Sequence, residues 1–216
     1  MKDIAVYGAG GFGKEVVCLI HEINEYFPAS ESWNFIGYFD DNKPKGYQAE
    51  YGTVLGSLDE LNSWSSPLAI AISIAQPANV KTLSERIVNP LISYPNLIAP
   101  DVIFYDRDSV KFGKGNIVCS SCLFSSDVIV GNFNIFNNFI SVGHDDIIGN
   151  FNSIMPAVRL SGNVTIGDCN FLGVSSIILQ SFKIGNYTTV GAGSVIMRKT
   201  KDGCTYVGNP AKKIEY

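Results

Sequence analysis

The sequence has little of what most metal and disulfide sites need. Only two histidines occur, His21 and His144, so a zinc enzyme with three histidine ligands is excluded. The five cysteines form no disulfide framework, and the single C-x-x-C, Cys119 and Cys122, has no second pair with which to complete a zinc site. We therefore expect free cysteines that pack as small apolar side chains, and no metal.

The sequence also lacks an excess of positive charge and any long apolar run. Lys and Arg number 16 against 20 Asp and Glu, a net charge of −4, which gives no electrostatic reason to expect nucleic acid or an anionic membrane as partner. No stretch offers the roughly 18 uninterrupted apolar residues of a membrane span, and residues 1–6 lack the pattern of a secretory signal. We expect a cytoplasmic globular protein.

What the second half does contain is a strict repeat. When the chain is divided into blocks of six from residue 110, the third residue of every block is large and apolar, fifteen times without interruption. These residues are Phe112, Val118, Phe124, Val130, Phe136, Val142, Ile148, Ile154, Leu160, Ile166, Leu172, Ile178, Ile184, Val190 and Ile196. A helix needs apolar residues every three or four positions and a half-buried strand every second one. The period of six therefore predicts a repeat architecture.

Glycine or another small residue often follows the apolar position. The glycines there are Gly113, Gly131, Gly143, Gly149, Gly167, Gly173, Gly185 and Gly191. Because glycine tolerates backbone angles that other residues resist, we interpret this position as a corner. Each hexapeptide then forms one short strand and one corner, and three of them form a coil, giving about five coils with a stack height of roughly 24 Å. The usual crossover preference would favour a right-handed coil.

The first half carries a nucleotide fingerprint. A short apolar strand at residues 3–7 precedes Gly8, Gly10 and Gly13, which form G-x-G-x-x-G, and a helix is expected to about residue 24. In this motif the glycines let the backbone approach a phosphate at the helix N-terminus. A second strand at residues 35–39 ends in Asp40 and Asp41, which can accept hydrogen bonds from ribose or base, and a third spans 68–73. The motif alone leaves NAD, another nucleotide or a ligand-free turn open.

Residues 1–96 have room for only half of a dinucleotide fold, which suits a mononucleotide better than NAD. The chain also resembles one family along its whole length, through VYGAGGFGKEV, GYFDD, GSLDEL, YPNLIAPDV, SVGHDDIIGNF and YVGNPAK. It is similar to the NeuD-like bacterial sugar acyltransferases, which include sialic acid O-acetyltransferases and N-acetyltransferases of nucleotide-linked 4-amino sugars. The resemblance implies a half-Rossmann-like α/β domain at 1–96 and a left-handed parallel β-helix at 97–216.

The resemblance further implies acetyl-CoA as co-substrate and a homotrimer with active sites between subunits. His144 would act as general base with Asp145 as its partner, and small residues one coil away, Ser126 and Gly162, would leave space around it. Asn137 matches a family position that contacts the active site. Ser153 stands where family members often carry a second histidine near the thioester, and SIMPA departs from the family's usual Ser-Pro-Gly-Ala.

Two sets of binding residues follow from the same resemblance. The nucleotide of the substrate is expected at Gly10, Gly11, Phe12, Asp40 and Asp41. Acetyl-CoA is expected at Gly143, Ser153, Met155, Gly173, Ala192, Arg198 and Lys199, with an oxyanion held by a backbone N–H near Gly143 or Gly173. Direct transfer in a ternary complex needs no protein nucleophile, because a thioester is already activated.

The sequence predicts an N-acetyltransferase of a nucleotide-linked 4-amino-4,6-dideoxy sugar, serving surface polysaccharide or glycan biosynthesis. Two alternatives stay open. An O-acetyltransferase of the sialic acid type would use the same base, and a non-catalytic nucleotide-binding trimer would need none.

Overall fold

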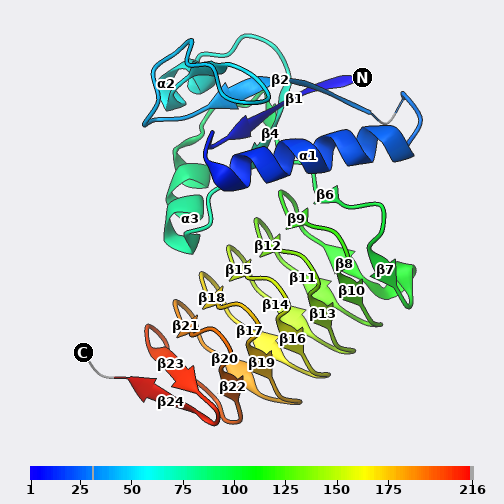
Figure 1. The fold of residues 1–216 in the computed structure, drawn as a ribbon, viewed down its shortest axis with the longest axis vertical. Coiled ribbons are helices and arrows are strands. Elements are labelled where there is room, and N and C mark those ends of the chain that lie inside the picture. The colour runs from blue at the N-terminus through cyan, green and yellow to red at the C-terminus, as the bar shows by residue number, and fades with distance from the viewer. Residues whose placement is uncertain (31, 215–216) are drawn as a thin grey trace.

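The computed structural model describes residues 1–30 and 32–214, which form a small α/β unit and a long three-sided column of coils (Figure 1). The α/β unit has one parallel sheet of order β3-β2-β1-β4-β5. Its strands are β1 (Lys2–Tyr7), β2 (Trp33–Phe39), β3 (Val54–Gly56), β4 (Leu68–Ile72) and β5 (Ile92–Ser93), and its helices are α1 (Gly11–Tyr26), α2 (Leu58–Asn62) and α3 (Pro77–Arg86). This arrangement is the predicted half-Rossmann-like fold.

The sheet is buried on both faces, as parallel sheets are. All five residues of β4, LAIAI, are buried, and so are the last four of β1. The apolar stripe of α1, which includes Val16, Ile20 and Ile23, packs against one face. Leu83 of α3 packs on the other side of the sheet, with Phe39 and Ile70.

The column is a left-handed parallel β-helix, as predicted. From β8 to β22 the short strands pair in parallel with the strand eighteen residues away, for example β10 with β13 through Leu123 and Ser141. We name the three faces by their first strands. The β6 face consists of β6 (Leu97–Ile98), β9 (Ile117–Val118), β12 (Ile135–Phe136), β15 (Ser153–Ile154), β18 (Phe171–Leu172) and β21 (Thr189–Val190).

The other two faces have the same geometry. The β7 face consists of β7 (Ile103–Phe104), β10 (Leu123–Phe124), β13 (Ser141–Val142), β16 (Arg159–Leu160), β19 (Ile177–Ile178) and β22 (Val195–Ile196). The β8 face consists of β8 (Lys111–Phe112), β11 (Ile129–Val130), β14 (Ile147–Ile148), β17 (Thr165–Ile166) and β20 (Lys183–Ile184). The hairpin of β23 (Thr205–Gly208) and β24 (Ala211–Ile214) extends the β6 face at its C-terminal end.

The second residue of each two-residue strand points into the column. Fourteen of the fifteen residues of the predicted apolar series are buried, and Phe112 is partly buried against them. Two strands of the column, β6 and β7, precede the hexapeptide repeat that was followed from residue 110. A one-turn 3-10 helix, Arg107–Ser109, lengthens the connection between β7 and β8, so the period of six is broken there and could not be followed further back.

The glycines after the apolar position are required for a different reason from the predicted one. The left-handed backbone falls two residues later, on non-glycine residues such as Phe133, Asp145 and Phe151. At Gly131 a Cβ would lie 2.5 Å from the carbonyl oxygen of Gly149 in the next coil. These glycines allow close stacking of coils, and our explanation by unusual backbone angles was wrong.

Three edges connect the faces. The His144 edge leads from the β7 face to the β8 face and contains 125–128, 143–146, 161–164, 179–182 and 197–200. The glycine edge leads from the β8 face to the β6 face and contains 113–116, 131–134, 149–152, 167–170 and 185–188. The Asn137 edge leads from the β6 face to the β7 face and contains 119–122, 137–140, 155–158, 173–176 and 191–194.

The α/β unit covers the β6 face and the glycine edge. Leu97 and Ile117 share an apolar cluster with α1, and Phe133 packs in the cluster of β4 and α3. Further along the column, the Lys81 ammonium of α3 donates to the Tyr187 hydroxyl at 3.0 Å. The His144 edge lies outside this contact and remains open.

Candidate active site

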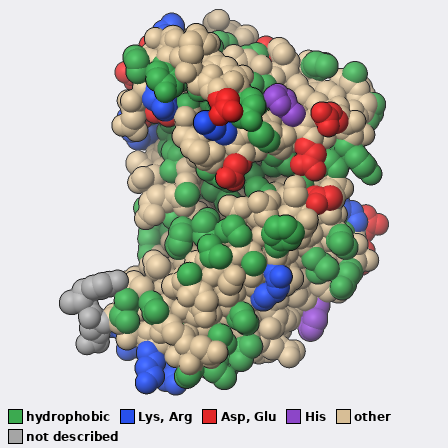
Figure 2. Space-filling view, in the orientation of Figure 1, with side chains coloured by type: hydrophobic (Ala, Val, Ile, Leu, Met, Phe, Trp, Pro, Cys, Tyr) green, Lys and Arg blue, Asp and Glu red, His purple; other side chains and the backbone are tan. Residues whose placement is uncertain are grey.

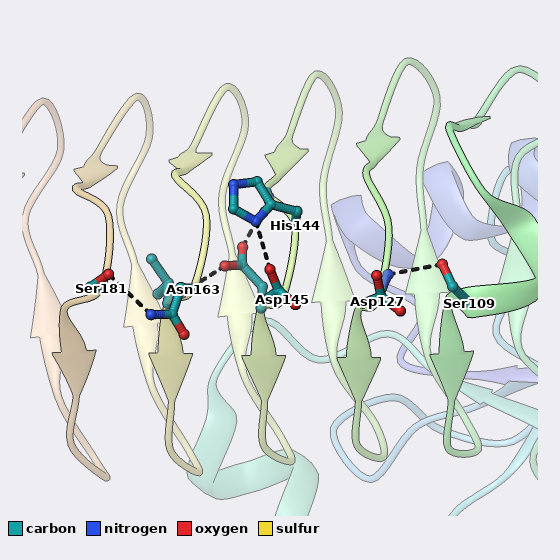
Figure 3. A network of polar contacts seen from close by, with 9 residues as sticks. Ser109, Asp127, His144, Asp145, Asn163 and Ser181 are labelled. Carbon is teal, nitrogen blue, oxygen red and sulfur yellow. Dashed lines mark hydrogen bonds and ion pairs between the residues drawn. The ribbon is translucent and has the colours of Figure 1, made fainter.

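His144 lies on the edge between β13 and β14, and its imidazole projects from the column beside Asp145 (Figure 3). Its Nδ1 is 2.7 Å from Oδ2 of Asp145. Because a carboxylate can only accept, this contact holds the proton on Nδ1 and leaves Nε2 as the basic nitrogen. The side chains of His144 and Asp145 are 53% and 60% exposed, so Nε2 is accessible to a substrate.

The next coil is shaped to receive the imidazole. A Cβ on Gly162 would lie 2.4 Å from Nε2 of His144, so only glycine permits this placement. The predicted small residue therefore matters because the ring itself occupies the space above it. The backbone of the corner is fixed on both sides, by Asp145 N–H donating to the Ser126 carbonyl at 3.1 Å and Asn163 N–H donating to the His144 carbonyl at 2.7 Å.

Directly after Asp145, Asp146 is completely buried. Its Oδ1 accepts from Val164 N–H at 2.8 Å and its Oδ2 from Gly143 N–H at 2.9 Å. Burial raises the pKa of the Asp146 carboxyl to about 7, and the two backbone hydrogen bonds and His144 oppose that shift. Asp146 is not among the site residues predicted from the sequence.

Six of the seven residues predicted to bind acetyl-CoA lie on two edges of the column, and Ser153 lies on β15. Asn137, Met155 and Gly173 are stacked at intervals of one coil along the Asn137 edge, and Ala192 lies one coil further, one position along the corner. Arg198 lies on the His144 edge at the same corner position as His144, three coils toward the C-terminus. Gly143 and Lys199 also lie on the His144 edge. The predicted residues on the edges therefore form two rows, one along the Asn137 edge and one along the His144 edge.

Some predicted residues have other structural roles. The Ser153 side chain is buried and donates to the Ala75 carbonyl at 2.6 Å, because the α/β unit covers its face of the column. The Oδ1 atom of Asn137 accepts from Asn138 N–H at 2.8 Å. Neither side chain contacts His144 through a hydrogen bond among the residues described.

The two predicted oxyanion donors are already engaged. Gly143 N–H donates to Asp146, and Gly173 N–H donates to the Val190 carbonyl at 2.8 Å. A Cβ on Gly173 would lie 2.6 Å from the Ala192 nitrogen, so this glycine serves coil stacking. An oxyanion would need a different donor from these two N–H groups.

The predicted nucleotide residues follow the carboxyl ends of β1 and β2, at the sheet edge where open α/β sheets bind ligands, but Gly11 lines a different cavity from Asp40 and Asp41. Gly13 is required structurally, since its Cβ would lie 2.0 Å from the Gly8 carbonyl oxygen, whereas Gly10 and Gly11 have open space around them. Phe12 is partly buried against the core beneath α1.

The two aspartates hold the loops around this site. Asp40 is buried and accepts from Ala9 N–H and Asn42 N–H, each at 2.8 Å. Asp41 accepts from the Tyr7 hydroxyl at 2.7 Å and from Leu58 N–H at 2.9 Å. Both line a cavity of about 330 Å³ together with residues of α3 that the sequence analysis did not find, Asn79, Thr82 and Arg86. These three lie on a short helix that carries no motif.

Within residues 1–30 and 32–214, no group of three His, Cys, Asp or Glu side chains could hold a metal ion. None of the helices described is long and apolar enough to cross a membrane.

The comparisons with known proteins begin with the α/β unit. Residues 3–87 match the family model described as the PglD N-terminal domain. Over the whole chain, the structure is similar to the acetyltransferase domain of PglB from Neisseria gonorrhoeae FA1090, solved in complex with acetyl coenzyme A. The identity is 28%, 99% of each chain is covered, and the TM-score is 0.87. The α/β unit thus matches the PglD N-terminal domain, and the whole chain is similar in structure to this acetyltransferase domain.

Two further solved structures are similar to this chain over its whole length. PerB from Caulobacter crescentus, in complex with CoA and GDP-perosamine, is 25% identical, with 100% of this chain and 98% of that chain covered and a TM-score of 0.85. WeeI from Acinetobacter baumannii AYE is 28% identical, with 99% of this chain and 100% of that chain covered and a TM-score of 0.86. The curated proteins contain no match. The predicted resemblance and the predicted fold are confirmed, and two of these similar structures were solved with acetyl coenzyme A or CoA bound.

Proposed function

We propose that this NeuD/PglD-like protein transfers the acetyl group of acetyl-CoA to the amino group of a nucleotide-linked 4-amino-4,6-dideoxy sugar. Residues 1–96 would bind the nucleotide sugar and residues 97–216 would carry out the transfer. The observation that carries this proposal is the accessible Nε2 of His144, whose Nδ1 is oriented by its contact with Asp145. The complex of PerB with CoA and GDP-perosamine supports the substrate class.

In the proposed reaction the sugar amine attacks the thioester carbonyl carbon of acetyl-CoA while Nε2 of His144 accepts the proton that the nitrogen loses. The C–N bond forms, the tetrahedral intermediate collapses, the C–S bond breaks, and the sulfur leaves as thiolate or takes a proton to leave as thiol. A positioned general base contributes about 10²–10⁴ to such a rate. Asp145 would stabilise the imidazolium formed on the way.

A homotrimer is part of the proposal. Several apolar side chains on or beside the two uncovered faces are about half exposed, namely Ile103, Ile129, Phe139 and Ile147. Figure 2 shows apolar side chains distributed over the surface of the column. Contact between columns would bury such side chains and would bring the His144 edge of one subunit to another subunit. A monomer in sedimentation velocity at assay concentration would contradict this part.

The function is tested by thiol release from acetyl-CoA with purified protein and a panel of dTDP-, UDP- and GDP-linked 4-amino-4,6-dideoxyhexoses, with free sialic acid as the competing acceptor. Turnover on one nucleotide amino sugar is expected and identifies the nucleotide. Turnover on sialic acid alone would establish O-acetylation instead, and no turnover on any acceptor would favour the non-catalytic trimer. His21→Ala provides a matched control, because the other histidine of the chain lies on α1.

A further inference from the structure

The residue that follows the catalytic pair interrupts the pattern of the column. At the corner position of Asp146, the preceding coil has Val128 and the following coil has Val164, and both are completely buried. A carboxyl group thus occupies an interior position that is apolar in both neighbouring coils. Burying a carboxylate is unfavourable unless hydrogen bonds compensate, so this exchange requires an explanation.

The backbone hydrogen bonds at this corner are also exceptional. The residue after each strand normally donates its N–H to the carbonyl of the strand in the next coil, as Ser125 does to Val142 and Ser161 does to Ile178. Gly143 instead donates to Oδ2 of Asp146 at 2.9 Å, and no hydrogen bond to the Leu160 carbonyl is present in the described part of the chain. The pairing of β13 with β16 is accordingly reduced to Ser141 and Arg159.

The same carboxylate also bonds to the next coil. Its Oδ1 accepts from Val164 N–H at 2.8 Å, two residues after Gly162, the glycine over which the imidazole lies. Asp146 therefore connects the residue before His144 to the coil beneath His144. We propose that Asp146 is a positioning residue for His144, because its carboxylate takes the Gly143 N–H out of the coil-to-coil ladder and fixes the corner that carries the imidazole. This inference rests on the proposed role of His144 as base.

The charge of Asp146 at neutral pH is consistent with that role. Burial raises its pKa to about 7, so both the neutral and ionised forms are present there, and only the ionised form accepts with both oxygens. The charged groups acting on it are His144, which lowers its pKa, and Asp145, which raises it. The neighbouring coils present Val128 and Val164, which carry no charge.

The test compares Asp146→Asn and Asp146→Val with a structural control, Asn134→Val. Asn134 occupies the equivalent buried position on the glycine edge, where its Oδ1 accepts from Asn152 N–H at 2.9 Å, and it is remote from His144 in the coil. We expect both Asp146 variants to lower kcat about tenfold, a typical effect of disturbed geometry at a reacting group, with KM for acetyl-CoA changed less than twofold. Asn134→Val should retain the wild-type kcat.

A second readout does not depend on activity. In protein labelled with ¹⁵N-histidine, His144 of the wild type should show the Nδ1-protonated tautomer at pH 8, and His21→Gln would assign the signals. The Asp146→Asn variant should lose that preference. Wild-type kcat and tautomer in Asp146→Asn would overturn the inference, and so would an equal loss of kcat in Asn134→Val. An active His144→Ala would instead contradict the proposed function, while the tautomer measurement would still decide the positioning role.

Discussion

The two edges that flank the β8 face are built from the same backbone, yet they differ in regularity. On the glycine edge, GNFN at 131–134 repeats at 149–152, and GDCN at 167–170 keeps the same hydrogen bonds. On the His144 edge, SSDV, GHDD, SGNV and LQSF follow one another without a common pattern. The glycine edge repeats the same hydrogen bonds in successive coils, whereas the His144 edge contains residues, such as His144 and Asp145, that occur in one coil only.

The regular edge is held by a ladder of buried amides. Asn116, Asn134, Asn152 and Asn170 are completely buried, and the Oδ1 of each accepts from the backbone N–H one coil later, at 2.7–2.9 Å. Phe133 and Phe151 stack outside the ladder with ring centroids 5.5 Å apart. The α/β unit covers this edge, so its repetition serves folding and docking.

The largest effect on kcat is expected from a substitution on the His144 edge. His144→Ala should lower kcat by about 10²–10⁴, since it removes the base from the proposed reaction. The melting temperature should stay within about 2 °C, because the side chain is half exposed and surface changes are worth little. Steady-state thiol release and thermal melting measure the two quantities, and kcat within a few-fold of wild type would contradict the assignment.

Two glycine substitutions, one on each edge, distinguish an effect on catalysis from an effect on stability. Gly162→Ala would place a methyl group 2.4 Å from Nε2 of His144 and should displace the imidazole, lowering kcat by about 10–100-fold. Gly149→Ala, on the glycine edge, would place its Cβ 2.3 Å from Oδ1 of Asp168 and should destabilise the fold by about 1–3 kcal/mol while the folded protein keeps its kcat. Equal kcat in both variants would contradict the claim that the His144 edge serves catalysis and the glycine edge serves stability.

The buried carboxyl of Asp146 predicts a pH dependence of stability. Its pKa is raised in the folded state to about 7, so the folded chain binds this proton more tightly than the unfolded chain. The resulting stabilisation is complete below about pH 4 and is lost as the pH rises through about 7, by up to ~4 kcal/mol. Relative to Asp146→Asn, wild-type stability in urea unfolding should therefore decline over this window; a constant difference would contradict the burial argument.

The smallest effect is expected from a substitution in the ladder of buried asparagines on the glycine edge. Asn134→Val leaves the Asn152 N–H without its acceptor, which should cost about 1–3 kcal/mol in the free energy of unfolding and leave kcat unchanged. Chemical denaturation and thiol release measure both. A variant as stable as the wild type would show that the amide ladder does not stabilise the regular edge.

The repeat made the column predictable, because the inward apolar residue recurs wherever coils must share one core. The handedness came only from the family resemblance. The role of the glycines was misread because sequence spacing shows that a small residue is needed but not which atom approaches it. The hexapeptide count began only at residue 110, after β6 and β7, because the turn at Arg107–Ser109 interrupts the period.

The candidate site was predictable only in part. His144 and Asp145 are adjacent in sequence, so their contact could be anticipated, and Asp40 and Asp41 follow directly from a strand end. The buried contact of Ser153 with Ala75 depends on how the α/β unit docks, which no local pattern encodes. Asp146 could have been found by comparing the repeat at its corner position, because the same position holds Val128 one coil before and Val164 one coil after.

The most direct test of the central claim is to locate the acetyl group in the product. The protein is incubated with acetyl-CoA and the nucleotide-linked 4-amino sugar that turns over, and the product is analysed by NMR and mass spectrometry. An amide at the C4 nitrogen, formed by the wild type and by His21→Ala but not by His144→Ala, is the predicted result. An ester on a sugar hydroxyl, or equal amide formation by His144→Ala, would contradict the account.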